Sequence, residues 1–348
     1  MSQFENVLKP KMKKKEAKMK KIVMVFLAIA LIGAFAALQT PVAQTKSKGD
    51  LVLTSKKVGS APKDAGSAVW NQAKEAKMVL AGAGKFEGKV IELKTKSVYT
   101  KDEVLFRFEW PDKDKSMQKN AWKFSGGKWN KIKANEDRLG LVFEINRIDK
   151  FATKGCAVMC HNESKNEKEW YYAVSSAKEK ADMWHWKSVR SNPVGHAEDG
   201  YVAFNATKEP EKGRKRDAGN GTKAANNRTK DKSGPAYMQD PSKSAAIMGT
   251  LLVSQAVEIK DNAGFKDGDE IPGYMLNTGW KDSFADVKAK GVWQNGKWTV
   301  VMSRKLNTGY DDDTQFNARK KYPFSLAVFD NSGEHDSYNA EPLKLQFK

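Results

Sequence analysis

The sequence of 348 residues contains few long apolar runs, few histidines and only two cysteines. Only one segment, residues 22–38, is long and apolar enough to resemble a membrane segment, which excludes a protein with several spans. Mean hydropathy is −0.66, yet 40% of the residues are hydrophobic and 10% are aromatic. Because these fractions suffice to bury a core, they exclude global disorder and allow one large domain or two ordinary ones.

Acidic residues are also in deficit. The chain carries 61 Lys and Arg against 42 Asp and Glu, a net charge of +19, which is typical of nucleic-acid binders. Residues 1–43 hold eight Lys and two acidic residues, which leaves 53 basic and 40 acidic residues, a charge of +13, for the remainder. Since no basic recognition motif appears among them, we expect no nucleic-acid partner.

The first 43 residues have the pattern of a targeting segment. A Lys-rich stretch over 9–21 precedes the apolar residues 22–38 and the small residues Pro41, Val42 and Ala43. This order predicts a signal peptide over 1–43, cleaved after export to the periplasm. An uncleaved N-terminal anchor formed by residues 22–38 is the alternative, because the run falls just short of the ~20 residues that span a bilayer.

The remaining residues, 44–348, have a β pattern and are expected to form a single domain. Short segments with period-two alternation and many β-branched and aromatic residues are separated by turn residues, without regularly alternating helices. This predicts an all-β fold, a mainly antiparallel β-sandwich with short helices. Residues Ala68–Ala76 are expected to form a short helix or turn that docks Trp70. Strands are expected at Lys89–Tyr99, Glu103–Trp110, Arg138–Asn146, Tyr201–Asn205, Leu251–Ile259, Lys297–Lys305, Tyr322–Phe329 and Leu343–Phe347.

Two local signals refine this expectation. Asn295-Gly296, between two apolar stretches, is the strongest hairpin signal in the chain. The segment 208–244 is polar and rich in Gly, Asn and Lys, and it is expected to be a long loop insertion that interrupts the sandwich.

Both cysteines lie within seven residues, at Cys156 and Cys160, and His161 follows directly. Two cysteines separated by two residues and followed by His are the usual attachment motif for haem c, and three intervening residues form a variant of it. Two thiols can add to the two vinyl groups of one porphyrin, and the adjacent imidazole then lies under the iron as an axial ligand. Attachment takes place outside the cytoplasm, in agreement with the predicted signal. The motif therefore predicts one covalent haem c.

Two other interpretations of this motif stay open. A zinc site of two Cys and one His has no evident fourth ligand nearby. A structural disulfide between Cys156 and Cys160, with an incidental His, suits an exported protein and could form across one helical turn.

A sixth iron ligand must come from elsewhere in the chain. Among the four histidines, His185 is the first candidate, because Trp184 and Trp186 flank it at strand spacing and are expected to pack on the haem. His335 is the second candidate. The thioethers of Met238 and Met275 come next, since Met and His form the other common electron-transfer pair.

Two cations close to His185 are candidates for pairing with the haem propionates. They are Lys187 and Arg190, although both could equally be solvated surface charges.

Several segments, in this order along the chain, resemble the haem-binding domain of the ethylbenzene dehydrogenase gamma-subunit type, which is related to the haem subunits of dimethylsulfide dehydrogenase and chlorate reductase. The resemblance covers most of residues 58–347. It rests on Trp70, Tyr99–Phe106, the Glu109–Asp112 corner, Asp137–Leu139, Gly155–His161, Trp184–Arg190, Gly296–Val300 and Ala327–Asp330.

The resemblance implies a β-sandwich that holds one haem and passes electrons in the periplasm, often as partner to a molybdenum enzyme. The named subunits hold haem b through a Met and a Lys, whereas Cys156, Cys160 and His161 make this sequence similar to a c-type branch. The family's Lys lies in the loop after the penultimate strand, near His335 here. The segment Asp182–Arg190 accompanies the c-type variant, which favours His185.

These observations predict an exported monohaem c-type cytochrome, an electron carrier or the non-catalytic haem subunit of an oxidoreductase. Its partner would be an acidic redox protein or a membrane-associated oxidoreductase, attracted by the +13 charge. Catalysis at the iron would require a vacant sixth position. A carbohydrate-binding or surface-ligand-binding β-sandwich without haem, with some of the ten Trp as a stacking platform, is the alternative from another class.

Overall fold

The structure, a computed structural model, describes residues 51–162, 164, 166–207, 209, 212–219, 224–243, 249–333, 338–339 and 342–348. These residues belong to one compact unit. The signal or anchor predicted over 1–43, and the candidate ligand His335, lie outside the described residues. In the described part of the chain, no helix combines the length and the apolar character that a membrane crossing needs.

Within the described residues the fold is all-β, as predicted, and its main sheet has 13 strands. The strands follow the order β10-β9-β8-β7-β19-β20-β2-β3-β4-β18-β17, and β1 pairs with β21 and β3. Neighbours are antiparallel except around β1. The bounds are β1 Leu51–Lys57, β2 Ala76–Gly82, β3 Val90–Tyr99, β4 Glu103–Pro111, β7 Arg138–Asn146, β8 Lys180–Lys187, β9 Glu198–Val202, β10 Arg214–Arg216, β17 Lys288–Gln294, β18 Lys297–Lys305, β19 Lys321–Phe329, β20 Tyr338–Asn339 and β21 Leu343–Phe347.

The two halves of this sheet pack face to face, which makes the sandwich. Trp186 of β8 lies with its ring centroid 6.2 Å from that of Trp110 on β4 and 5.0 Å from that of Trp298 on β18. All three side chains are buried in the main core. Strands β7, β8 and β19 therefore have one face in the core and one face turned away from it.

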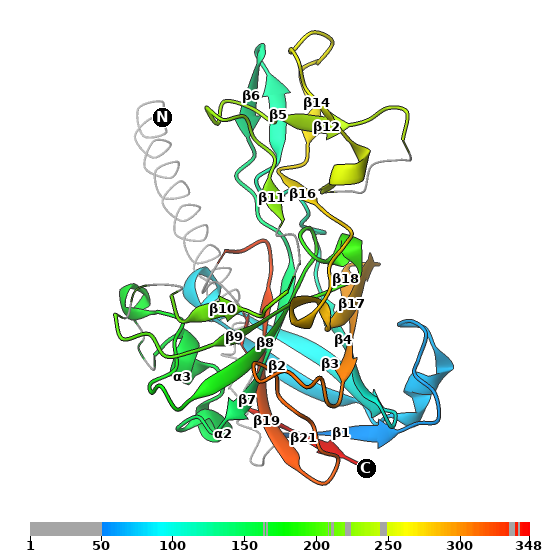
Figure 1. Cartoon of the computed structure of the whole chain (residues 1–348), viewed down its shortest axis with the longest axis vertical. Helices are drawn as coiled ribbons and strands as arrows, with labels where there is room; N and C mark the ends of the chain where they lie inside the picture. The colour runs from blue at the N-terminus through cyan, green and yellow to red at the C-terminus, as the bar shows by residue number, and fades with distance from the viewer. Residues whose placement is uncertain are drawn as a thin grey trace, which may run out of the picture. The chain divides into compact units, whose positions relative to one another are not determined.

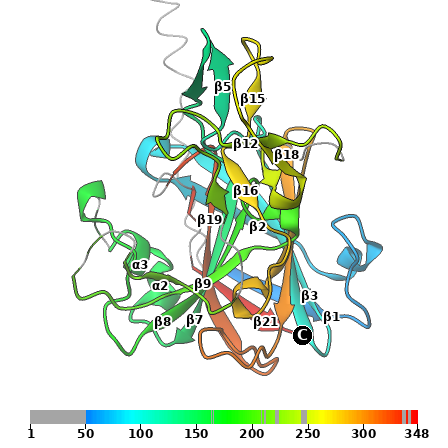
Figure 2. The same cartoon turned by 45° about the horizontal axis from the view of Figure 1, so that its top comes forward.

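Shorter strands form three small sheets, and both views show strands from them at the opposite end from β1 and β21 (Figures 1 and 2). One joins β15, β5 and β6, another joins β11, β16 and β13, and the third pairs β12 with β14. Their bounds are β5 Trp122–Ser125, β6 Lys128–Lys131, β11 Ala225–Asn226, β12 Tyr237–Gln239, β13 Leu251–Leu252, β14 Ala256–Glu258, β15 Glu270–Ile271 and β16 Tyr274–Leu276.

The segment 208–244 differs from the expected loop, because its described residues supply β10 to the main sheet and β11 and β12 to the small ones. Backbone pairing and the buried side-chain amide of Asn227 hold this segment in place. Asn227 donates to the carbonyl oxygens of Tyr237 and Pro272 and accepts from the amides of Ala236 and Tyr237. Such strands cannot be recognised from hydrophobic patterns in the sequence, because their stability comes from hydrogen bonds rather than from apolar burial.

The hairpin predicted at Asn295-Gly296 is confirmed. Both residues have positive φ, 52° and 70°, and they join β17 to β18 in the tight turn that Asn-Gly favours.

The helical elements are short. The short helix or turn expected over Ala68–Ala76 is the 3₁₀ turn η1, which spans Ala68–Gln72 and buries Trp70. The α-helices α2 and α3 lie beside β7 and β8 (Figures 1 and 2). Their bounds, and those of the other 3₁₀ turns, are α2 Phe151–Lys154, α3 Ala157–Cys160, η2 Gly84–Phe86, η3 Glu167–Glu169, η4 Asn192–Val194, η5 Val253–Gln255 and η6 Ser283–Ala285.

Candidate functional site

The outer face of β8, β7 and β19 forms the floor of a cleft. His185 on β8 pairs with Gly140 on β7, which pairs with Ala327 on β19. Residues directly opposite one another in antiparallel strands share a face, so these three form one row. Gly140 leaves space in front of the imidazole, because a Cβ at this position would meet only the Phe329 ring, at 3.8 Å.

The cysteine motif packs over this floor at a glycine. Gly155, between α2 and α3, has φ 60°, and a Cβ there would lie 2.9 Å from the hydroxyl of Ser325 on β19. Glycine is therefore required both for the turn and for the close approach. Met159 of α3 is fully buried among Val142 and its neighbours, which fixes the short helix against the sheet.

The cleft brings together the four residues on which the haem c interpretation depends. They are Cys156, Cys160, His161 and His185. The cleft contains about 520 Å³ of space, part of it open to solvent. The other lining residues are Gly140, Val142, Tyr172, Met183, Arg214, Ser325, Leu326, Ala327 and Phe329.

Neither cysteine is part of a disulfide, so the disulfide considered from the sequence is not formed. Cys156 is buried and Cys160 is half-buried. A hydrogen bond with Cys160 lowers the pKa of the Cys156 thiol, and although burial opposes this shift, a bond with Ser325 adds to it. Among the described residues, neither cysteine belongs to a group of three His, Cys, Asp or Glu ligands placed to hold one metal ion, which disfavours zinc.

His161, directly after the second cysteine, stacks on Trp170 with the ring centroids 4.2 Å apart and the planes 25° apart. The indole is itself fixed, because its Nε1 donates to the Ser164 carbonyl oxygen at 2.8 Å. The stacking orients the imidazole at the wall of the cleft.

His185 is 5% exposed, and Arg214 Nη2 donates to its Nδ1 at 2.7 Å. Burial, followed by the charges of Lys187 and Arg214, lowers its pKa well below the usual value, so the ring is neutral at pH 7. Because a guanidinium only donates, Nδ1 accepts and the ring proton lies on Nε2. No hydrogen-bond partner satisfies Nε2 within the described structure.

A basic cleft adjoins the first one and shares Met183 and Arg214 with it. Both propionate candidates line it, but each already has a carboxylate partner. Lys187 donates to Glu198, and Arg190 Nε donates to Glu136 at 2.5 Å. The other lining residues are Arg138, Glu198, Asp199, Gly200, Lys215 and Arg216.

Lys187 and Glu198 form a buried ion pair, although burial lowers the pKa of Lys187 well below its usual value. Although burial raises the pKa of the Glu198 carboxyl, the charge of Lys187 overcomes this effect and lowers it to about 2. The carboxylate is therefore ionised over the physiological range and keeps Lys187 in place.

Four of the predicted residues line neither cleft. Trp184 and Trp186 point to the opposite face of β8, into the main core, because successive strand residues alternate between faces. Met238 packs beside the small sheet of β5, and Met275 lies on β16. His335 lies outside the described residues.

Sequence reasoning did not identify Tyr172, Met183, Arg214 or Phe329 as cleft residues. Met183 carried a usable signal, since it lies two residues before His185 on the same strand face. The sequence around Arg214 gave no such signal, because its strand β10 belongs to the segment that was predicted to be a loop.

Comparison with known proteins agrees with the resemblance. The family model described as ethylbenzene dehydrogenase matches residues 67–340. The chain belongs to this family. The matched range includes the cysteine motif, His185 and the basic cleft. No curated protein matches the chain.

Two solved structures similar to this member of the ethylbenzene dehydrogenase family are carbohydrate-binding modules of family 9 from Caldicellulosiruptor kristjanssonii. The complex with glucose has 9% identity and a TM-score of 0.33, and the match covers 85% of this chain and 95% of that one. The complex with cellotriose has 7% identity and a TM-score of 0.32, with coverage of 85% and 93%. At these TM-scores the likeness carries no argument about function.

Proposed function

We propose that this protein is an exported monohaem c-type cytochrome that transfers electrons in the periplasm. Cys156 and Cys160 would hold the haem covalently, and His161 and His185 would be its axial ligands. The observation that carries the proposal is the single cleft lined by both thiols and both imidazoles, which come from separate segments of the chain.

The donor set fits haem c. Each thiol would add across one vinyl group, so that a carbon–sulfur bond forms, the thiol hydrogen passes to the other vinyl carbon and no oxidant is consumed. The lowered pKa of Cys156 favours this reaction, since the thiolate is the better nucleophile. The unpartnered Nε2 of His185 supplies a second nitrogen on the cleft wall.

One hydrogen bond must change when His185 binds iron through Nε2. A neutral imidazole needs its lone pair at that atom, so the proton has to move to Nδ1, and Arg214 has to release Nδ1. Arg214 also lines the basic cleft. There it would join Lys187 and Arg190 around the haem propionates.

The haem would supply one-electron chemistry at its iron, and the chain would set the potential through its ligands, its burial and the nearby cations. The leader over 1–43 would direct export, with cleavage or anchoring by residues 22–38. The +13 charge would attract an acidic redox partner or a membrane-associated oxidoreductase, and family membership makes a molybdenum enzyme a natural choice.

The covalent haem can be tested directly. The chain is expressed in a host with a cytochrome c maturation system, extracted with acid acetone and examined as the pyridine haemochrome. We expect the pellet to keep a haem c spectrum, and the C156S and C160S variants to retain less haem. Haem that is fully extracted from the wild type, or a colourless product, would contradict the proposal.

The carbohydrate-binding alternative receives no support from the surface. Nine of the ten Trp side chains are buried and the tenth, Trp293, is half-buried, so the expected stacking platform of exposed indoles is not formed.

A further inference from the structure

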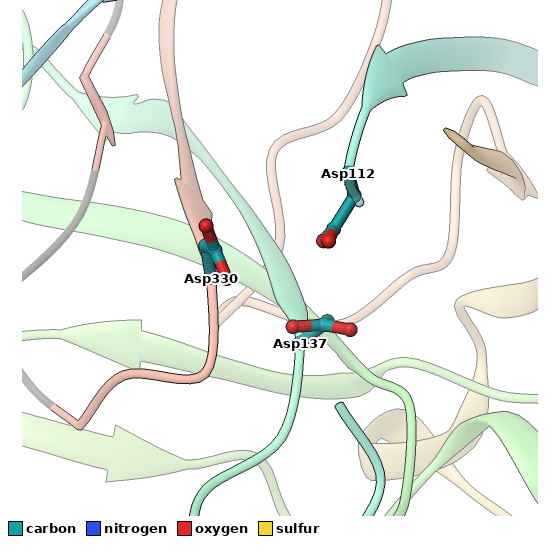
Figure 3. Close-up of side chains that lie close together, drawn as sticks. All are labelled: Asp112, Asp137 and Asp330. Carbon is teal, nitrogen blue, oxygen red and sulfur yellow. The ribbon is translucent and has the colours of Figure 1, made fainter. Parts of the chain in front are cut away.

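Three aspartates meet at strand ends, outside both clefts. Asp112 follows β4, Asp137 precedes β7 and Asp330 follows β19, and their carboxyl groups converge (Figure 3). One oxygen of each lies within 4.8 Å of an oxygen of the other two. All three belong to segments that carried the family resemblance but received no role from it. The haem proposal leaves them unused as well.

The site is held in place by the surrounding backbone and one indole. Asp137 accepts hydrogen bonds from the Ser116 amide at 2.7 Å, the Trp298 indole at 3.0 Å and the Asn331 amide at 3.0 Å. The amide of Asp112 donates to the Gly296 carbonyl oxygen at 2.8 Å. Two of the three carboxylates are therefore fixed in position before any ligand arrives.

A buried acceptor in this group lacks a partner. Asp112 is 6% exposed, and its Oδ1 accepts from the Asp114 amide. Its Oδ2 has no hydrogen-bond partner among the described residues, and its carboxyl points toward the other two (Figure 3). None of the ion pairs found in the described chain involves Asp112, Asp137 or Asp330. Burial, with the charges of Asp137 and Asp330, raises the pKa of Asp112 to about 8. Buried carboxylates this close require a neutralising cation or a proton.

A second aspartate triad shows how this fold supplies such a cation from its own chain. Asp182, Asp199 and Asp313 are as close together as the first three, and Arg304 Nη1 lies 2.8, 3.5 and 2.9 Å from their oxygens. Arg304 is itself 1% exposed. Among the described residues, no Arg or Lys forms an ion pair in the corresponding place beside Asp112, although the charges of Lys85 and Lys89 act on Asp330. The neutralising charge at Asp112 is therefore a proton or a cation from solution.

We propose that Asp112, Asp137 and Asp330 bind one calcium ion. Calcium takes six to eight hard oxygen ligands at about 2.3–2.6 Å, so three carboxylate oxygens that lie within 4.8 Å of one another are close enough to share one ion. Asp330 is half-buried and leaves a route for the ion and its water ligands. The ion would join the end of β4 to β7 and β19, the strands that carry Gly140 and Ala327 on the cleft floor.

The test is calorimetric titration of the full chain, freed of metal by a chelator, with calcium chloride and separately with magnesium chloride. We expect calcium to bind, and magnesium to bind at least about tenfold more weakly, because Mg²⁺ demands tighter octahedral geometry. D112N and D330N should each lower calcium affinity by at least about 100-fold, more than the ~10–100-fold loss typical of an outer partner. Calcium should raise the Tm of the wild type but not of D112N.

The matched control is D217N, which removes a buried carboxylate from a different acidic group and should change calcium affinity at this site by less than about threefold. D330N covers the case in which D112N fails to fold, since Asp330 is half-buried. The proposal is overturned by a wild type that binds no calcium, by binding that survives in D330N, by equal loss in D217N, or by tighter binding of magnesium.

Discussion

Arg214 Nη2 donates to Nδ1 of the buried His185 at 2.7 Å, and this bond fixes the ring proton on Nε2. If His185 binds haem iron through Nε2, the bond must break, and Arg214 stays as a cation beside the haem. The variant R214M should therefore keep a six-coordinate low-spin spectrum but show a midpoint potential lower by tens of millivolts, because loss of a nearby positive charge favours ferric iron. Potentiometric titration measures the shift. An unchanged potential would mean that Arg214 does not approach the haem.

The sixth ligand can be identified from the spectrum of one variant. H185A should convert the ferric haem from low-spin to high-spin, because the removed imidazole leaves the iron without its second axial nitrogen. The control is H196A, since His196 is also buried but lies beside Trp280 and Lys288, away from the cleft lining. A low-spin spectrum that persists in H185A would transfer the assignment to another side chain, with His335 as the first to examine.

Gly140 offers a test of where the haem lies. A Cβ at this position would meet only the Phe329 ring, at 3.8 Å, so G140A should fold and keep its haem. G140L should place its larger side chain in the cleft in front of His185 and lower the haem content per chain by at least about half. The ratio of haem absorbance to protein concentration measures this effect, and circular dichroism checks the fold. Equal haem content in the two variants would contradict a haem on this face.

Much of the main sheet could be predicted because its strands bury one face at a time. The bounds predicted for β7, β18 and β21 agree with the structure, since period-two alternation marks where core residues begin and end. The same alternation implied that Trp184 and Trp186 point away from His185. The expectation that Trp184, His185 and Trp186 line the same wall of the haem site did not take this alternation into account.

The rest of the site depends on contacts between distant segments. Cys156 and His185 meet because α3 packs over β7 and β19, and single-sequence patterns do not report which strands become neighbours. Arg214 reaches His185 from β10, a three-residue strand that is held to β9 by backbone pairing and by the ion pair of Arg216 with Glu198. A polar sequence with so few residues in the sheet has no hydrophobic signature.

Asp217 predicts a pH dependence of stability that is separate from haem chemistry. Burial, with the charges of Asp312, Asp182 and Asp313, raises its pKa to about 9, and neither carboxylate oxygen has a hydrogen-bond partner in the described structure. The unfolded carboxyl titrates near 3.8. Between these values the folded state keeps a proton that the unfolded state releases, so stability contributed by this group falls as the pH rises from about 4 to about 9.

The variant D217N removes this titration and should raise the free energy of unfolding by about 2 kcal/mol at pH 8, with little change at pH 4. At pH 8 the wild-type carboxyl ionises when the chain unfolds, which favours the unfolded state, and Asn cannot ionise. Urea unfolding of both proteins at the two pH values, in the presence of a chelator, measures the difference. D311N, at an exposed neighbouring position, is the control and should behave as the wild type at both. A stabilisation of D217N that is equal at pH 4 and pH 8 would show that the pKa of Asp217 does not differ between the folded and the unfolded protein, and would contradict this prediction.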